Sequence, residues 1–83
     1  MLSKLLFTAF VLVNCANNWE QEVLSGLKHV VEEVQGTYGI FDFVCKIQGQ
    51  DMTVIEKTLS DIKKIQHISH TTTIHTIPEQ NKD

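Results

Sequence analysis

The sequence has no apolar run long enough to cross a membrane. Its longest run, residues 5–13, reaches about half of the ~18 apolar residues that a spanning helix needs. This run follows Lys4 and resembles a short secretory signal, but Asn14 stands where a lipoprotein signal has a small residue before its cysteine. We therefore expect no membrane association and a cytoplasmic location, and we interpret residues 8–15 as a buried strand.

Cations and cysteines are also few. Seven Lys and Arg residues stand against ten Asp and Glu residues, so the net charge is −3. Nucleic-acid binding depends on clustered cations that neutralise phosphates, and this charge balance opposes direct contact with DNA. The cysteines, Cys15 and Cys45, have neither CxxC nor zinc-ligand spacing, so they predict buried, reduced thiols and no disulfide framework.

Signatures of catalysis and of metal binding are missing. The sequence offers no defensible Ser/His/Asp, Cys/His or paired-carboxylate arrangement and no glycine-rich phosphate loop. In a strand, His70 and His75 point to opposite faces because they are an odd number of residues apart, and His67 lies in the preceding turn. We expect no enzyme activity, no cofactor and no metal, with a metal site shared across a symmetric interface as the alternative.

The length of the chain allows one domain and limits its core. A domain of 83 residues hides only roughly 60% of its unfolded surface. With 42% hydrophobic and 20% charged residues, the chain has an ordinary globular composition and is expected to fold. Self-association would add the buried surface that a small core lacks.

A strand and an amphipathic helix are predicted first along the chain. The strand, residues 8–15, is apolar on both faces, so it must be covered on both sides. The helix is predicted over residues 19–30, with Asn18 as its N-cap and Gln21 as the capping-box partner. Its inward stripe consists of Trp19, Val23, Leu27 and Val30.

A hairpin follows the helix. Gly36 and Gly39 punctuate a stretch of Val, Thr, Tyr, Ile and Phe, which is typical of strands joined by a tight turn. We predict strands over residues 33–38 and 42–48, with the turn at residues 39–41.

A second helix and a last strand complete the chain. Asp51 is the expected N-cap of a helix over residues 52–65. The apolar stripe of this helix is Met52, Ile55, Leu59, Ile62 and Ile65, and its outer face carries charged residues. The last strand is predicted over residues 68–77, Pro78 ends it, and residues 79–83 are expected to form a frayed tail.

The predicted order is strand, helix, strand, strand, helix, strand. This is the split βαβ or ferredoxin-like pattern of the α+β class, in which two helices cover one face of a four-stranded antiparallel sheet. The other face of the first strand is then left apolar, and an exposed apolar sheet face marks an interface. We expect at least a dimer that buries sheet against sheet, as in dimeric α+β folds.

Several segments resemble the effector-binding domain of the Lrp/AsnC transcription regulators. They are the strand at 9–15, the hairpin at 38–42, the Asp51-Met52 start of the second helix, and the Thr71-Thr72-Thr73 strand. The resemblance covers about residues 8–77. It implies sheet-to-sheet dimers that assemble into tetramers, octamers or larger rings, with an amino acid bound between dimers.

The helix-turn-helix of these regulators is expected to be missing. It would need about 50 residues before the first strand. We therefore interpret residues 1–83 as a single, stand-alone ligand-binding domain, with full-length Lrp/AsnC-type regulators as candidate partners.

The resemblance also implies an effector site. Its residues would be Tyr38, Gly39, Phe41, Asp42, Met52, Ile74 and His75. The carboxylate of Asp42 would pair with the α-ammonium of an amino acid, while the backbone amides of the turn would receive the α-carboxylate. Two alternatives stay open: Asp42 only holds the hairpin through loop amides, and Met52 packs in the core.

Two other functional classes remain. Small dimeric ferredoxin-like proteins include enzymes of the monooxygenase and haem-degrading kind, and His29 is the one plausible axial ligand for a haem. The third class is a pure assembly module that binds no effector.

Overall fold

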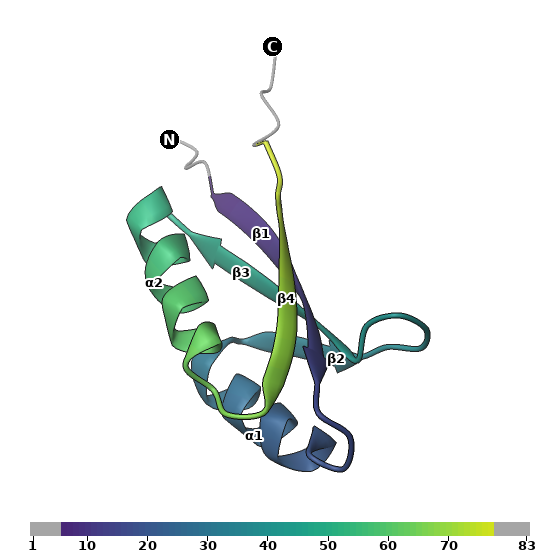
Figure 1. Cartoon of the computed structure of the whole chain (residues 1–83). Helices are drawn as coiled ribbons and strands as arrows, with labels where there is room; N and C mark the ends of the chain where they lie inside the picture. The colour runs from purple at the N-terminus through teal and green to yellow at the C-terminus, as the bar shows by residue number, and fades with distance from the viewer. Residues whose placement is uncertain (1–5, 78–83) are drawn as a thin grey trace.

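The computed structural model describes residues 6–77. Its elements are β1 (Phe7–Cys15), α1 (Glu20–Val30), β2 (Glu33–Gly36), β3 (Phe43–Gly49), α2 (Met52–Lys63) and β4 (Ile68–His75), drawn in Figure 1. The predicted order of elements is confirmed. Three of them, β2, α2 and β4, end two residues earlier than predicted, and the expected tail at 79–83 lies outside the described residues.

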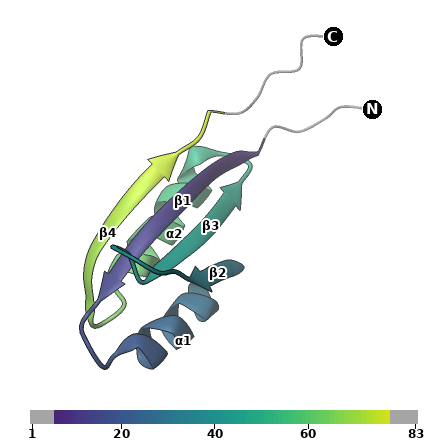
Figure 2. The same cartoon turned by 90° about the vertical axis from the view of Figure 1, so that its right-hand side faces the viewer.

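The four strands form one sheet in the order β2-β3-β1-β4, and every neighbouring pair is antiparallel. β1 is therefore an inner strand with β3 on one edge and β4 on the other. Figure 2 looks onto the sheet with α2 behind it. This arrangement confirms the predicted α+β, ferredoxin-like class.

The core lies between the sheet and the helices. Directly paired residues of neighbouring strands share a face, so alternate positions of β1 and β3 point toward α1 and α2. The buried set consists mainly of Ala9, Val11, Val13, Phe43, Cys45 and Ile47 from the sheet and Val23, Leu27, Ile55 and Ile62 from the helices. Full burial of one such aliphatic side chain contributes roughly 1.5–3 kcal/mol.

The two helix starts differ in how well local sequence predicts them. Asp51 is the N-cap of α2, as predicted, and its side chain accepts a hydrogen bond from the Val54 backbone N–H at 3.1 Å. The predicted N-cap at Asn18 is wrong. Trp19 occupies the N-cap of α1 without a side-chain cap, and Asn18 has a positive φ of 75° in the preceding turn. A residue in the left-handed region cannot take the extended backbone of an N-cap.

Trp19 does not belong to the inward stripe of α1, contrary to the prediction. Its side chain is 40% exposed and stacks on His67, with ring centroids 3.7 Å apart and planes within 7°. His67 also has a positive φ, of 74°, and its carbonyl accepts a hydrogen bond from the Ala16 N–H. The stack therefore joins the turn before α1 to the turn before β4.

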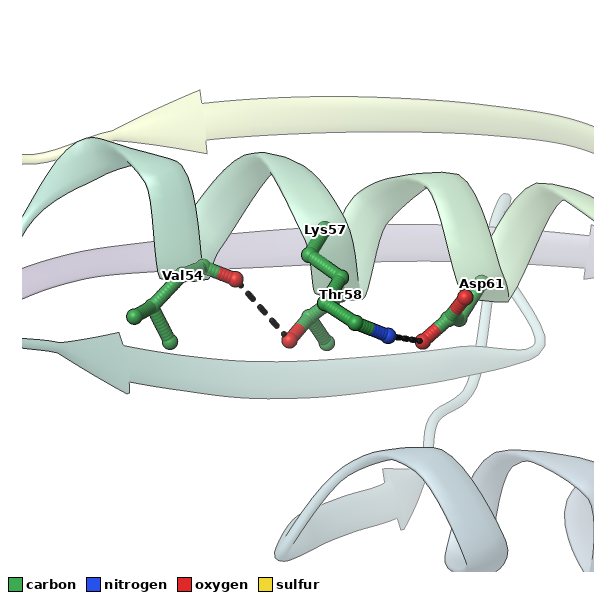
Figure 3. Close-up of polar contacts among 4 residues, drawn as sticks. All are labelled: Val54, Lys57, Thr58 and Asp61. Atoms are coloured by element: carbon green, nitrogen blue, oxygen red, sulfur yellow. Dashed lines mark hydrogen bonds and ion pairs between the residues drawn. The ribbon is translucent and has the colours of Figure 1, made fainter.

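The outer face of α2 is polar, as its periodicity predicts. Figure 3 shows Lys57 paired with Asp61 one turn later, at 3.3 Å, and the Thr58 hydroxyl donating to the Val54 carbonyl. Such an exposed pair adds only about 0.3–0.5 kcal/mol. No helix between residues 6 and 77 is long and apolar enough to span a membrane.

Gly49 permits the close approach of α2 to the end of β3. A Cβ at this position would lie 2.8 Å from the Val54 side chain, whereas a Cβ at Gly36 would meet nothing closer than 4.0 Å. We expect Gly49→Ala to lower the free energy of unfolding by about 1–3 kcal/mol, the usual cost of overpacking. Urea unfolding followed by circular dichroism measures this change.

Gly36→Ala is the matched control in the same sheet. It should leave the unfolding midpoint nearly unchanged. Equal midpoints for Gly49→Ala and the wild-type chain would show that α2 does not approach β3 this closely.

Candidate functional site

The loop at residues 37–42, here called the hairpin loop, projects from one end of the sheet (Figure 1, right). Hydrogen bonds fix it to the end of β1. The Asn14 side-chain amide donates to the Ile40 carbonyl at 2.6 Å, and the Asp42 N–H donates to the Val13 carbonyl at 2.9 Å. Inside the loop, the Thr37 hydroxyl donates to the Phe41 carbonyl, and the Thr37 backbone N–H donates to the Asp42 carbonyl.

Asp42 connects this loop to β1 through its side chain. Its Oδ2 accepts a hydrogen bond from the Cys15 backbone N–H at 2.9 Å, in a partly buried position. This hydrogen bond therefore holds the hairpin loop against β1. Burial raises the pKa of the Cys15 thiol, and the negative charge of the Asp42 carboxylate, the second largest cause, raises it further.

The tip of the hairpin loop presents apolar side chains to solvent. Tyr38 is fully exposed and Ile40 is 83% exposed. Gly39 between them has a φ of 102°, a left-handed conformation that glycine adopts without strain, as the predicted turn requires. The backbone is thus fixed while the side chains at its tip remain free.

The structure does not bring the seven predicted site residues together in one chain. Tyr38, Gly39, Phe41 and Asp42 lie at the end of the sheet where Phe43 pairs with Val13. Met52 follows the opposite end, where Gly49 pairs with Phe7, and His75 pairs with Ala9 near that end. The length of β3, roughly 20 Å at ~3.4 Å per residue, separates the hairpin loop from the start of α2 at Met52.

The second group is itself divided between the two faces of the sheet. Ile74 pairs with Phe10 on the face away from the helices, and His75 pairs with Ala9 on the face that carries them. Met52 is 36% exposed at the start of α2, so its predicted core role is wrong.

Among the described residues, 6–77, no helix lies over one face of the sheet. This open face has an apolar centre formed by Phe10, Leu12, Val44 and Ile74, which the strand register places side by side. Ile74 is 49% exposed and the other three are half-buried. Polar side chains surround the centre, among them Gln35, Lys46 and Thr72.

A cleft of about 480 Å³, which the sequence analysis missed, lies at the edge of the sheet beside β2. It lies between the end of α1 and the open face, and its lining includes Lys28, Glu32, Glu33 and Lys46. Glu33 and Lys46 are direct cross-strand partners. Only the register of β2 on β3 could have identified them as neighbours.

The remaining candidates from the sequence are histidines and the two cysteines. His70 pairs with Asn14 and His75 with Ala9, so the two histidines point to opposite faces as predicted. His29 is exposed on α1, with its Nδ1 2.8 Å from the Ser25 carbonyl. Both thiols are free and buried, and burial raises the pKa of Cys45 to about 11.

Solved structures share this fold. FFRP-DM1 superposes with a TM-score of 0.77 and 28% identity, over 86% of this chain and 99% of its own. AsnC from E. coli has a TM-score of 0.78 at 17% identity, over 93% of this chain and 54% of its own. The transcriptional regulator NMB0573 from Neisseria meningitidis, solved as a complex with L-Met, has a TM-score of 0.73 at 14% identity. That match covers 92% of this chain and 53% of NMB0573.

The fold thus corresponds to nearly all of FFRP-DM1 and to about half of the two longer proteins. No protein-family model matches the chain, and no curated protein matches its sequence.

Removing the Asp42 acceptor should destabilise the chain. Asp42→Ala leaves the partly buried Cys15 N–H without its partner, so we expect the free energy of unfolding to fall by about 1–3 kcal/mol. Asp42→Asn keeps an oxygen at this position, so its free energy of unfolding should fall by less than half of the decrease expected for Asp42→Ala. Urea unfolding measures both variants, and an Ala variant as stable as the wild type would contradict the structural role of this bond.

Proposed function

We propose that the chain, an Lrp/AsnC-like domain, is a regulatory module that binds an amino-acid effector and assembles through its sheet. FFRP-DM1 belongs to the same Lrp/AsnC group at 28% identity, and NMB0573 is a transcriptional regulator that binds L-Met. These neighbours support a regulatory role with a small-molecule ligand. Neither neighbour gives support for a catalytic activity.

The observation that carries this proposal is the uncovered open face. Apolar side chains at its centre lie on three neighbouring strands, β3, β1 and β4, and form one continuous surface. A second copy packed sheet against sheet would remove them from water, at about 25 cal/mol per Å² of apolar surface. Dimers of this kind would then associate further into tetramers, octamers or larger rings.

The hairpin loop is the proposed effector-binding element. It presents the Tyr38 side chain from a backbone that is already fixed, and the turn amides would receive the α-carboxylate. Met52 and His75 lie toward the other end of the sheet and Ile74 lies in the centre of the open face, so they would join the loop only across an interface between copies. The effector site is therefore proposed to depend on assembly, with full-length Lrp/AsnC-type regulators as further partners.

A pure assembly module is the alternative. One observation favours it: the Asp42 carboxylate, the group proposed to bind the α-ammonium, already accepts a hydrogen bond from Cys15. A carboxylate has further lone pairs, so this bond does not block a ligand.

The open face can be tested by charge substitution. Leu12→Asp places a carboxylate in the apolar centre but outside the core, so the chain should stay folded and sediment as a monomer. Thr53→Asp, on the exposed first turn of α2, is the control and should leave the dimer intact. Val11→Asp reaches the core, where the side chain is 1% exposed, and should unfold the chain.

Analytical ultracentrifugation at micromolar concentration separates these outcomes. A wild-type chain that sediments as a monomer would overturn the proposed assembly, and so would a Leu12→Asp chain that remains dimeric.

Effector binding can be tested by thermal shift with each of the twenty amino acids. A ligand at about 100 times its Kd stabilises by ~2.7 kcal/mol. For a domain of this size the Tm should then rise on the order of 10 °C. Asp42→Asn should weaken the binding by about 1.5–3 kcal/mol, because the hydrogen bond involves a charged group. If all twenty amino acids leave the Tm unchanged, the assembly module is the better interpretation.

A further inference from the structure

The strand β4 forms one edge of the sheet, and within residues 6–77 no strand lies beyond it (Figure 2). Its residues are half-buried or exposed, and none is buried. The other edge strand, β2, has four residues, whereas β4 has eight. The outer side of β4, here called the β4 edge, is therefore the longer of the two edges.

The register of β4 on β1 shows which backbone groups point away from the sheet. The Thr76 N–H donates to the Thr8 carbonyl at 3.0 Å. In an antiparallel ladder, such hydrogen-bonded positions alternate with positions whose backbone groups point the other way. Counting back from Thr76, every second residue faces β1, so the residues that face outward are Thr71, Thr73 and His75.

The composition of the β4 edge does nothing to prevent pairing. Natural sheets protect their edges with Lys, Pro, inward-pointing charges or bulges, because unpaired N–H and C=O groups bind another strand readily. Residues 68–77 contain no Lys, Arg, Asp, Glu, Pro or Gly, and most are Thr or Ile, which favour strands. The register shift of the β1–β4 ladder lies at Asn14/Cys15, so residues 71–75 are regular.

We propose that the β4 edge pairs with the β4 edge of a second copy of the chain, antiparallel and about a two-fold axis at Thr73. The outward residues lie symmetrically about this position. Thr73 would therefore pair with Thr73 of the second copy, and Thr71 with His75. Each of these pairs would exchange two backbone hydrogen bonds, and no formal charge would lie opposite a like charge.

The side chains beside the β4 edge fit a second copy. On the helix-bearing face, Thr73 would lie opposite Thr73, a favourable cross-strand pair. On the open face, Ile74 is 49% exposed at the border of the apolar centre. Pairing about a two-fold axis puts equivalent faces on the same side, so the apolar centres of both copies would meet at their β4 strands. A strand of another sequence would not supply this match.

This edge contact differs from the proposed packing of sheet on sheet. It uses backbone groups that lie in the plane of the sheet, whereas the open face uses side chains such as Phe10 and Leu12. Covering the open face therefore leaves the β4 edge accessible. The inference goes beyond the proposed function, because the edge would join copies that the open face has already assembled. That role rests on the proposed function, but the edge contact itself does not.

The test is amide hydrogen exchange of the full ¹⁵N-labelled chain, measured by NMR at micromolar and millimolar concentration. One short strand pairs weakly because association removes translational and rotational freedom, so we expect edge pairing only at millimolar concentration. The amides of Thr71, Thr73 and His75 should then exchange at least about tenfold more slowly. Val34 and Gly36, whose N–H groups point outward from β2, are the internal control and should exchange equally at both concentrations.

A proline substitution tests the same contact. Thr73→Pro removes an outward N–H and leaves the β1–β4 ladder intact, because proline is tolerated on an edge strand where the missing N–H faces away from the sheet. It should abolish the concentration dependence of exchange at Thr71 and His75. Gly36→Pro makes the same change on β2 and should preserve it. If Thr73→Pro fails to fold, the exchange of the wild-type chain decides alone.

Three results would overturn the inference. Equal exchange of the outward β4 amides at both concentrations would show that the β4 edge stays unpaired. Slow exchange that persists in a folded Thr73→Pro chain would show that another contact protects these amides. In a mixture of labelled and unlabelled chains, intermolecular NOEs from β4 to β2, in place of those expected between Thr72 and Ile74, would show a different partner strand. Sedimentation of the wild-type chain as a micromolar monomer would overturn the sheet packing alone.

Discussion

The inner strand β1 has apolar side chains on both faces, and the rest of the structure is arranged around the need to cover them. Val11 and Val13 are buried beneath the helices, while Phe10 and Leu12 lie on the open face. Residues 6–77 form two helices, and both pack on the same side of the sheet. The apolar side chains of β1 on the other side are therefore left uncovered, and the proposed assembly rests on them.

Local patterns in the sequence were sufficient for the order and type of the elements. An apolar run rich in β-branched and aromatic residues identified β1, helical spacing identified α2, and Asp51 capped that helix as its chemistry predicts. The start of α1 was different because tertiary contacts decided it. Trp19 fits the helical stripe by spacing, yet its ring stacks on His67, which lies 48 residues further along the chain by residue number.

The candidate sites depended on information that one sequence does not carry. The resemblance supplied seven positions, and it is the strand register that places four of them at one end of the sheet and Met52 at the other. The cleft was missed for the same reason. Glu33 and Lys46 are 13 positions apart by residue number, and nothing in their spacing shows that they face each other. Residues that form a site across strands become visible only when the register is known.

The hydrogen bonds that hold the hairpin loop also lower the conformational entropy that a partner would have to remove when it binds the loop. The Asn14 side chain, the Asp42 carboxylate and the backbone of Val13 already fix the loop backbone before any partner arrives. Ordering a free loop would cost roughly 1–2 kcal/mol of conformational entropy per residue. Here a partner would need to immobilise only side chains such as Tyr38, which has few rotatable bonds for its contact area. Even a modest contact surface at the tip could therefore yield measurable affinity.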